Sequence, residues 1–228
     1  AVLDGLAAGA RDFGTVVRLT PDIVRDLGTE QAQRVLDVAL RFAGHGVVAL
    51  NCAGSERAGI EPFGPYFRTA KEAGLGSVPH AGEWAGPQNV WDTLATFEPD
   101  RIGHGVRAID DPELVATLAD RAIPLEISPL SNVATGVYPS LAEHPFMRLR
   151  DAGVIVTLNS DDPPMFGDAW VGRVYEAARD AWGLDDGHLA RIARTAVDVS
   201  FADAATKREI GAGIDAWLGS EPEPVTAP

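Results

Sequence analysis

Short apolar runs recur along this chain and alternate with longer segments of helical periodicity. Six runs predict β-strands, at residues 15–19, 46–51, 76–79, 101–103, 124–128 and 154–158. Their apolar residues are consecutive rather than alternating, which is typical of strands that are buried on both faces of a parallel sheet. Strand–helix repeats of roughly 25–30 residues favour right-handed βαβ units.

The segments between these runs carry helix signals. Residues 29–42 have apolar positions at helical spacing and are followed by Gly44, a typical residue after a helix end. Asp111 and Pro112 read as the N-cap and the first residue of another helix. Further helices are predicted at 146–152, at 169–182, at 185–197 and at about 201–218.

This pattern predicts an α/β fold, a TIM-type (β/α)₈ barrel with extra helices at its C-terminal end. A closed barrel of this type needs eight strands and the chain offers about six, so we expect the first two strands to precede this sequence. Residues 1–11 already look helical and lack an initial methionine. We expect residues 1–220 to form one partial barrel domain and residues 221–228 to form a disordered tail.

Composition narrows the possible partners. The 228 residues carry a formal net charge of −14, which disfavours binding to the phosphate backbone of nucleic acids. Apolar runs stay well below the ~20 residues needed to cross a membrane. The single cysteine, Cys52, reads as a small buried residue at a strand end, and one cysteine agrees with a reducing compartment. We therefore expect a cytoplasmic protein without nucleic-acid or membrane partners.

Candidate chemistry follows three of the predicted strands. His80 and Glu83 lie in His80-Ala81-Gly82-Glu83, and His104 lies between two glycines. Asp161 and Asp162 come after the last strand. Each motif alone has an ordinary structural explanation: a satisfied histidine with a surface glutamate, a glycine turn, and a helix N-cap.

Their order favours a shared site. If the strands are parallel, the three motifs meet at one edge of the sheet, which is where barrel enzymes carry their active sites. Imidazole nitrogens and carboxylate oxygens suit a divalent metal ion, and a carboxylate beside the metal suits proton transfer. The sequence therefore predicts a metal-dependent catalytic site.

Five motifs together resemble the adenosine deaminase family of zinc-dependent aminohydrolases, in the order and spacing of that family. They are Ala53-Gly54-Ser55-Glu56, His80-Ala81-Gly82-Glu83, Arg101-Ile102-Gly103-His104-Gly105, Ser128-Pro129-Leu130-Ser131-Asn132 and Asn159-Ser160-Asp161-Asp162-Pro163. The resemblance implies hydrolytic deamination of an adenosine-type purine to the 6-oxo product and ammonia. The small-molecule partner would be a purine base or a purine nucleoside.

The resemblance also implies residue roles. His80 and Asp161 would bind Zn²⁺, and Glu83 would protonate the purine ring while zinc-bound hydroxide attacks the neighbouring carbon. His104 would orient and polarise that hydroxide. In the substrate pocket, Asp162 would bind the imidazole side of the purine and the backbone of Gly54 the pyrimidine side.

The chain departs from the family pattern in lacking a His-x-His motif, which supplies two further zinc ligands in the family. Two protein ligands are few for a tight zinc site. Two other hypotheses therefore stay open: a catalytically incomplete purine-binding fragment, and an amidohydrolase barrel that acts on a non-purine substrate. Stoichiometric zinc or turnover of an aminopurine would distinguish them from the preferred hypothesis.

Overall fold

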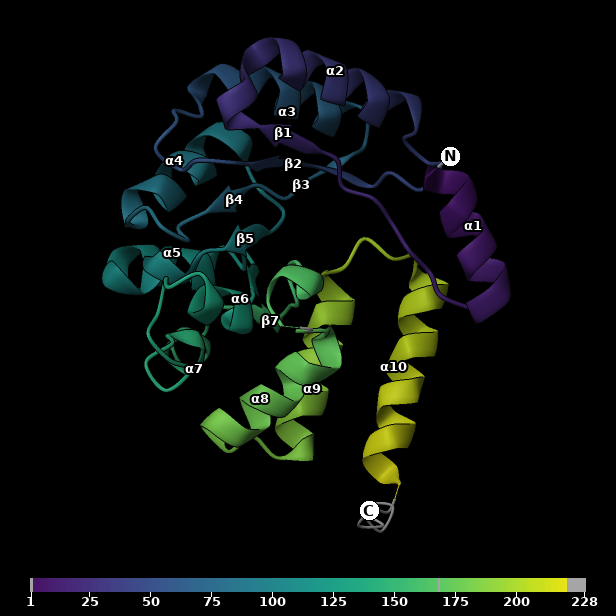
Figure 1. Ribbon diagram of the computed structural model, residues 1–228, viewed down its shortest axis with the longest axis vertical. Coiled ribbons are helices and arrows are strands. Elements are labelled where there is room, and N and C mark those ends of the chain that lie inside the picture. The colour runs from purple at the N-terminus through teal and green to yellow at the C-terminus, as the bar shows by residue number, and fades with distance from the viewer. Residues whose placement is uncertain (1, 168, 221–228) are drawn as a thin grey trace.

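A computed structural model describes residues 2–167 and 169–220 of the chain (Figure 1). Its strands are short, and they are β1 Asp22–Val24, β2 Ala49–Ala53, β3 Gly76–Ser77, β4 His80–Ala81, β5 Ile102–His104, β6 Leu125–Ile127 and β7 Val156–Leu158. The α-helices are α1 Val2–Phe13, α2 Gly28–Arg41, α3 Gly64–Glu72, α4 Pro87–Phe97, α5 Pro112–Asp120, α6 Pro129–Ala134, α7 Phe146–Asp151, α8 Val171–Trp182, α9 Asp186–Val199 and α10 Ala204–Gly219. Short 3₁₀ turns occur at η1 Arg25–Leu27, η2 Glu61–Phe63, η3 Val106–Asp110 and η4 Pro163–Met165.

All strand pairs in the described residues are parallel, in the orders β1-β2-β3 and β4-β5-β6-β7. β3 and β4 are two parts of one strand passage, since only Val78 and Pro79 separate them. The amide of Val78 still donates to Leu50 of β2, and the carbonyl of Pro79 accepts from Gly103 of β5. The described residues therefore make six strand passages, five of which overlap predicted apolar runs, and the predicted run 76–79 covers β3 and the link to β4.

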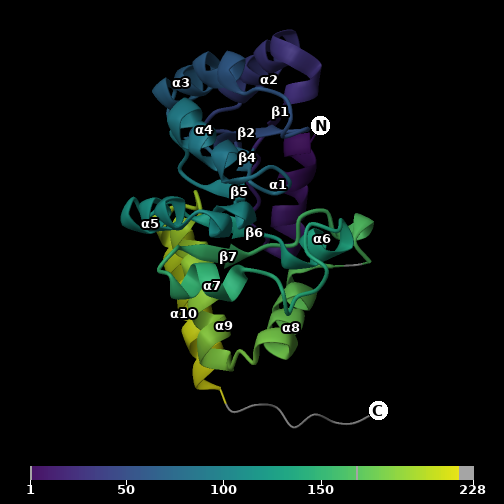
Figure 2. The same ribbon diagram turned by 90° about the vertical axis from the view of Figure 1, so that its left-hand side faces the viewer.

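Helices cover the outer side of these strands. Figure 1 shows α2, α3, α4 and α5 following one another around an arc, with the strands on its inner side, and Figure 2 shows α5 below α2, α3 and α4 in the side view. Buried side chains between the two layers form two apolar clusters, one centred on β1 and β2 and one on β5, β6 and β7. Within the described residues β7 and β1 do not pair, so the arc stays open. Sequential parallel strands with outer helices are the arrangement of a (β/α)₈ barrel, here represented in part.

Two predicted strands differ from the structure: one does not form as a strand, and the other is shifted along the sequence. The run 15–19 is irregular, and Leu19 makes only an isolated bridge to Val47. Apolar composition was misleading there because Val16 and Val17 are half-exposed or nearly so, whereas Ile23 in β1 is fully buried. β2 begins three residues later than the predicted run 46–51 and ends at Ala53.

The helix predictions agree better with the structure. Asp111 caps α5 by accepting hydrogen bonds from the amides of Glu113 and Leu114, and Pro112 is its first residue. The extra C-terminal helices form as α8, α9 and α10, of which α9 packs against both β7 and α10. The predicted tail 221–228 lies outside the described residues. The assignment of residues 1–220 to one domain stays a prediction.

The N-terminal ends of the strands are tied to the C-terminal helices. Arg101, just before β5, binds Glu126 of β6 at 2.5 Å and donates to the carbonyl of Val199 at 2.8 Å. Its guanidinium also lies 4.1 Å from the ring centroid of Phe201. These contacts stabilise the strand ends opposite those that carry the candidate site. No helix in the described part of the chain has the length and apolar character of a membrane span.

Candidate active site

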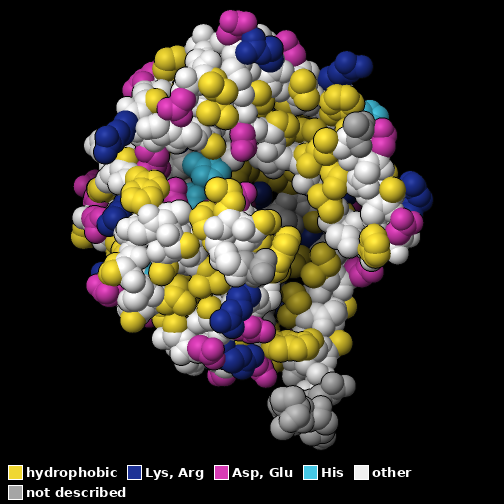
Figure 3. Space-filling view, viewed as in Figure 1, with side chains coloured by type: hydrophobic (Ala, Val, Ile, Leu, Met, Phe, Trp, Pro, Cys, Tyr) yellow, Lys and Arg dark blue, Asp and Glu magenta, His cyan; other side chains and the backbone are white. Residues whose placement is uncertain are grey.

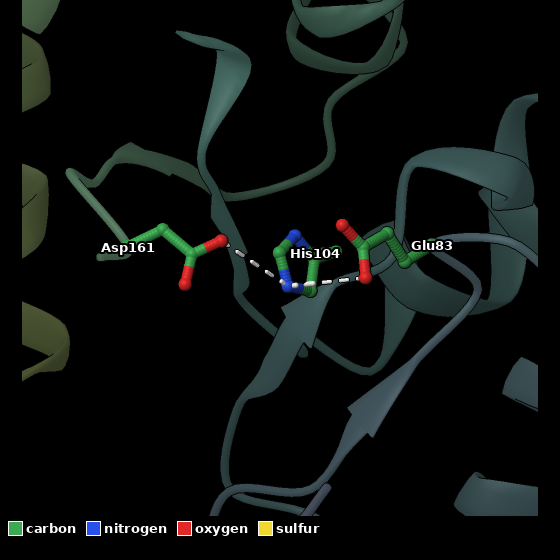
Figure 4. A group of neighbouring side chains, drawn as sticks. All are labelled: Glu83, His104 and Asp161. Carbon is green, nitrogen blue, oxygen red and sulfur yellow. Dashed lines mark ion pairs between the residues drawn. The ribbon is translucent and has the colours of Figure 1, made fainter. Parts of the chain in front are cut away.

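The C-terminal ends of the strands bring three predicted residues together (Figure 4). Glu83 follows β4, His104 ends β5, and Asp161 follows β7. His104 Nε2 lies 3.8 Å from Glu83 Oε2 and 3.9 Å from Asp161 Oδ2. One ligand atom from each residue fits within 4.8 Å of the others. The prediction that the motifs after separate strands share one edge of the sheet agrees with this placement.

The backbone at this edge adopts an uncommon conformation. His104 and Asp161 have φ angles of 62° and 57°, in the left-handed region that side chains other than glycine rarely occupy. Such residues cost of order 1–3 kcal/mol each and are concentrated at functional sites. The turn after β4 also needs Gly82, where a Cβ would lie 2.4 Å from Val90 Cγ2.

His80 lies beside this group rather than within it. Its ring centroid is 5.0 Å from that of His104. Its Nδ1 lies 3.0 Å from Asn51 Oδ1, and its carbonyl accepts a 2.5 Å hydrogen bond from Arg25. Asn51 Oδ1 is an acceptor, so Nδ1 carries the proton in neutral His80, and its Nε2 retains a lone pair for a ligand.

Glu83 is held at the edge of a cavity and has a strongly perturbed pKa. The Glu56 carboxylate accepts hydrogen bonds from the amides of Glu83, Trp84 and Ala85 at 3.0, 2.8 and 2.5 Å, which fixes this loop. Burial, followed by the charges of Asp161 and Glu56, raises the pKa of Glu83 to about 7. Glu83 is therefore available both as an acid and as a base at neutral pH.

His104 is neutral in this environment. Its side chain is almost completely buried, and burial followed by the nearby charge of His80 lowers its pKa to about 3. Its contacts to Glu83 and Asp161 are therefore contacts of a neutral imidazole rather than ion pairs. On its other side, His104 Nδ1 lies 3.4 Å from Asn132 Nδ2.

The cavity next to Glu83 has a volume of about 570 Å³ and is lined by residues 54–57, His80 and residues 83–85. Figure 3 shows histidine side chains in a hollow of the face that is seen in Figure 1. Gly54 lines this cavity; its φ is 92° and a Cβ there would lie 2.4 Å from Asp26 Oδ2, so this position requires glycine. Asp162 is exposed and is not among the residues that line this cavity.

Several residues of the site were not among the residues predicted from the sequence. Asn132 contacts both Glu83 and His104, and His144 contacts Asn132. Asp22 interacts electrostatically with His80 and Asp162 and forms a hydrogen bond with Asn51. Asn132 had a signal, because it belongs to one of the five motifs, but His144 looked like an ordinary loop histidine before a proline.

The adenosine deaminase family model matches residues 1–217. The chain belongs to the adenosine deaminase family. It is 44% identical over 227 residues to the aminodeoxyfutalosine deaminase of Streptomyces coelicolor, covering 96% of this chain and 58% of that protein. The family resemblance of the five motifs is thus confirmed.

Solved structures of the family share the fold. The adenine deaminase of Arthrobacter aurescens superposes with a TM-score of 0.90 at 29% identity, covering 96% of this chain and 67% of that one. An amidohydrolase from Burkholderia ambifaria with bound Zn superposes with a TM-score of 0.82 at 25% identity, covering 95% and 61%. The partial barrel is therefore confirmed as a TIM-type fold, and the chain spans about three fifths of the length of such relatives.

The donor atoms of this family member fit a divalent metal ion. His80 offers an unshared ring nitrogen whose orientation Asn51 fixes from behind, as is common for histidine ligands. Carboxylate oxygens of Asp161 and Glu83 lie close together in one group with His104, and His80 lies beside that group. Nitrogen and oxygen donors of this kind suit zinc and its neighbours in the first transition row.

Proposed function

We propose that this chain carries the catalytic residues for hydrolytic deamination of an aminopurine base or nucleoside. The observation that carries the proposal is Glu83, a carboxyl group with a pKa of about 7 that faces a neutral histidine and a cavity in a member of this family. In the overall reaction, water adds to the amino-bearing carbon, and the amino group leaves as ammonia with formation of the oxo product.

Glu83 handles the protons of this reaction. Protonated Glu83 gives a proton to the ring nitrogen next to the carbon under attack, which prevents negative charge from accumulating on the ring. The resulting carboxylate then takes a proton from the added water and passes it to the leaving amino group. A pKa near neutrality suits both steps, since neither form of Glu83 is scarce.

His80 and Asp161 would hold a zinc ion. When bound, zinc lowers the pKa of a coordinated water to roughly 7 and so supplies the nucleophile at neutral pH. His104 lies between Glu83 and Asp161 and orients the attacking water by a hydrogen bond from its ring.

Substrate recognition is assigned to Gly54 and Asp162. The backbone of Gly54 lines the cavity and contacts the pyrimidine side of the purine. Asp162, which follows the proposed ligand Asp161, binds the imidazole side. The cavity of about 570 Å³ falls within the usual range for small-molecule sites and is large enough for a purine nucleoside.

The test is a substrate panel with the zinc-loaded protein that contains this chain. Adenine, adenosine and larger adenosine derivatives are compared with cyclic and linear amides, and ammonia release is measured together with the ultraviolet change of the purine. We expect ammonia from at least one aminopurine in equal amount to the oxo product. Turnover of amides alone would contradict the proposal and support a non-purine amidohydrolase, and purine binding without turnover would support a binding protein.

A further inference from the structure

A buried series of hydrogen bonds connects His104 to the backbone amide of Phe146, the first residue of α7. We propose that His144 and Asn132 are positioning residues that keep the proton of neutral His104 on Nε2, so that an N–H group, rather than a lone pair, faces Glu83 and Asp161. The consequence for catalysis rests on the proposed function, whereas the position of the proton can be measured without turnover.

The series of hydrogen bonds begins at an atom that can only be a donor. The backbone amide of Phe146 donates to His144 Nδ1 at 3.2 Å. A backbone N–H is always a donor, so Nδ1 of His144 is an acceptor and carries no proton. Burial, followed by the charge of Arg148, lowers the pKa of His144 to about 4. Neutral His144 therefore carries its single ring proton on Nε2.

The proton on His144 fixes the orientation of the Asn132 amide. His144 Nε2 lies 3.1 Å from Asn132 Oδ1 and donates to it. If the amide of Asn132 were turned over, two N–H groups would face each other. At the other end, the carboxylate of Glu83 accepts from Asn132 Nδ2 at 3.3 Å, which favours the same orientation.

Asn132 in turn determines the tautomer of His104. An amide NH₂ group has two hydrogens, and those of Asn132 serve Glu83 Oε1 and His104 Nδ1, the latter at 3.4 Å. His104 Nδ1 is then an acceptor, and the ring proton lies on Nε2. This is the nitrogen that faces Glu83 Oε2 at 3.8 Å and Asp161 Oδ2 at 3.9 Å.

Burial makes a wrong tautomer or a lost hydrogen bond in this series costly. Asn132 is fully buried, and His104 and His144 are 3% and 4% exposed, so water has little access to replace a lost partner. The ring of His144 is also packed against Tyr138, with ring centroids 5.0 Å apart. In such a place an unpaired polar group costs more than it would at the surface. The wrong tautomer of His104 would bring two N–H groups together at Asn132.

The tautomer also decides between two roles for His104. Its Nε2 belongs to a group of atoms that could hold a metal ion. A nitrogen that carries a proton cannot be a metal ligand, because its lone pair is not available. The series of hydrogen bonds therefore assigns His104 the role of a hydrogen-bond donor beside the metal ion. His80, with its free Nε2, remains the histidine ligand of the metal ion.

The test is a long-range ¹H–¹⁵N correlation spectrum of the full chain with ¹⁵N-labelled histidine, which distinguishes the two neutral tautomers. Signals are assigned by single substitutions of the five histidines. We expect His104 and His144 both in the Nε2–H form at pH 7. A wild-type His104 in the Nδ1–H form would overturn the proposal whether or not the protein deaminates purines.

Two substitutions at His144 separate the hydrogen bond from packing. In His144→Gln the side-chain NH₂ can still donate to Asn132, so His104 should stay in the Nε2–H form. In His144→Phe the ring volume remains but the donor is lost, and His104 should show a mixture of tautomers. The same substitution at a partly exposed histidine, His188→Gln, is the matched control. Identical His104 spectra in the Phe and Gln variants would overturn the proposal.

Turnover provides the second readout. A misplaced proton on His104 affects the reacting water more than the binding of the purine, so His144→Phe should lower kcat by about 10- to 100-fold relative to His144→Gln, with little change in KM. A change in KM alone would show that His144 shapes the pocket rather than the proton of His104.

Discussion

At the scale of single residues, the surroundings of Glu83 decide which protonation states it can use. Its carboxyl group is largely removed from water, and Asp161 and Glu56 place further negative charge nearby. Each of these influences makes loss of the proton harder, while the hydrogen bond from Asn132 acts in the opposite direction. Since Glu56 also binds the amides that shape the loop, one residue influences both the position and the pKa of Glu83.

Replacing Glu56 with Gln tests this influence. The change removes one negative charge near Glu83, so the carboxylate form becomes easier to reach and the pKa of Glu83 should fall from about 7 toward its ordinary value of 4.5. The measurement is a ¹³C NMR titration of the Glu83 carboxyl carbon in the metal-free chain. Glu113→Gln, on the exposed surface of α5, is the control and should leave the titration unchanged. An unchanged or higher pKa in the Glu56 variant would refute the assignment.

At the scale of elements, the spacing between β4 and β5 depends on a glycine. Gly103 of β5 pairs with His80 of β4, and a Cβ at Gly103 would lie 3.1 Å from Cγ and Nδ1 of the His80 ring. Because Gly103 has no side chain, the His80 ring can lie close to the backbone of β5 while its Nδ1 stays 3.0 Å from Asn51 Oδ1. A glycine inside a buried strand is thus explained by the close approach of the ring.

Gly103→Ala should therefore lower the free energy of unfolding by about 1–3 kcal/mol, the usual cost of overpacking a core. It should also shift the ring signals of His80, because its contact with Asn51 is disturbed. Denaturant titration and histidine NMR measure the two effects. Gly213→Ala in α10 is the control: nothing lies near its added Cβ, and helix propensity predicts a gain of up to about 1 kcal/mol. Equal effects at both glycines would contradict this account.

The elements also show which parts of the fold and of the site could be predicted from the sequence. Parallel strands end at one edge, so apolar runs followed by histidine or carboxylate residues were enough to predict that Glu83, His104 and Asp161 lie close together. The run 15–19 failed because apolar composition does not reveal burial, and the structure leaves Val16 half exposed. His144 was missed because its link to His104 passes through Asn132, and contacts between residues far apart in sequence leave no local pattern.

At the scale of the whole molecule, buried neutral histidines couple stability to pH. The pKa of His144 is lowered to about 4, so below pH 6.5 the unfolded chain binds a proton that the folded chain does not. The contribution of His144 is therefore complete above pH 6.5 and is lost as the pH falls toward 4. The raised pKa of Glu83 has the opposite effect, since it lowers the free energy of unfolding as the pH rises. Glu83 therefore partly conceals the effect of His144 in the total stability.

A difference measurement isolates His144. Relative to His144→Gln, the wild-type chain should lose about 3 kcal/mol of unfolding free energy between pH 7 and pH 4, since each pKa unit corresponds to roughly 1.4 kcal/mol. Urea titrations of both proteins across this range give the difference. A constant difference between the two proteins at all pH values would show that His144 does not remain neutral in the fold.

In the proposed function, Glu83 transfers protons while other residues hold the metal ion. The most direct measurement is ammonia release from an aminopurine by the zinc-loaded protein, with wild type and Glu83→Gln compared and Glu113→Gln as the surface control. We expect Glu83→Gln to lower kcat by at least about 100-fold, the usual contribution of acid–base catalysis, while zinc stays near the wild-type content. Wild-type turnover by Glu83→Gln with zinc bound would contradict this expectation.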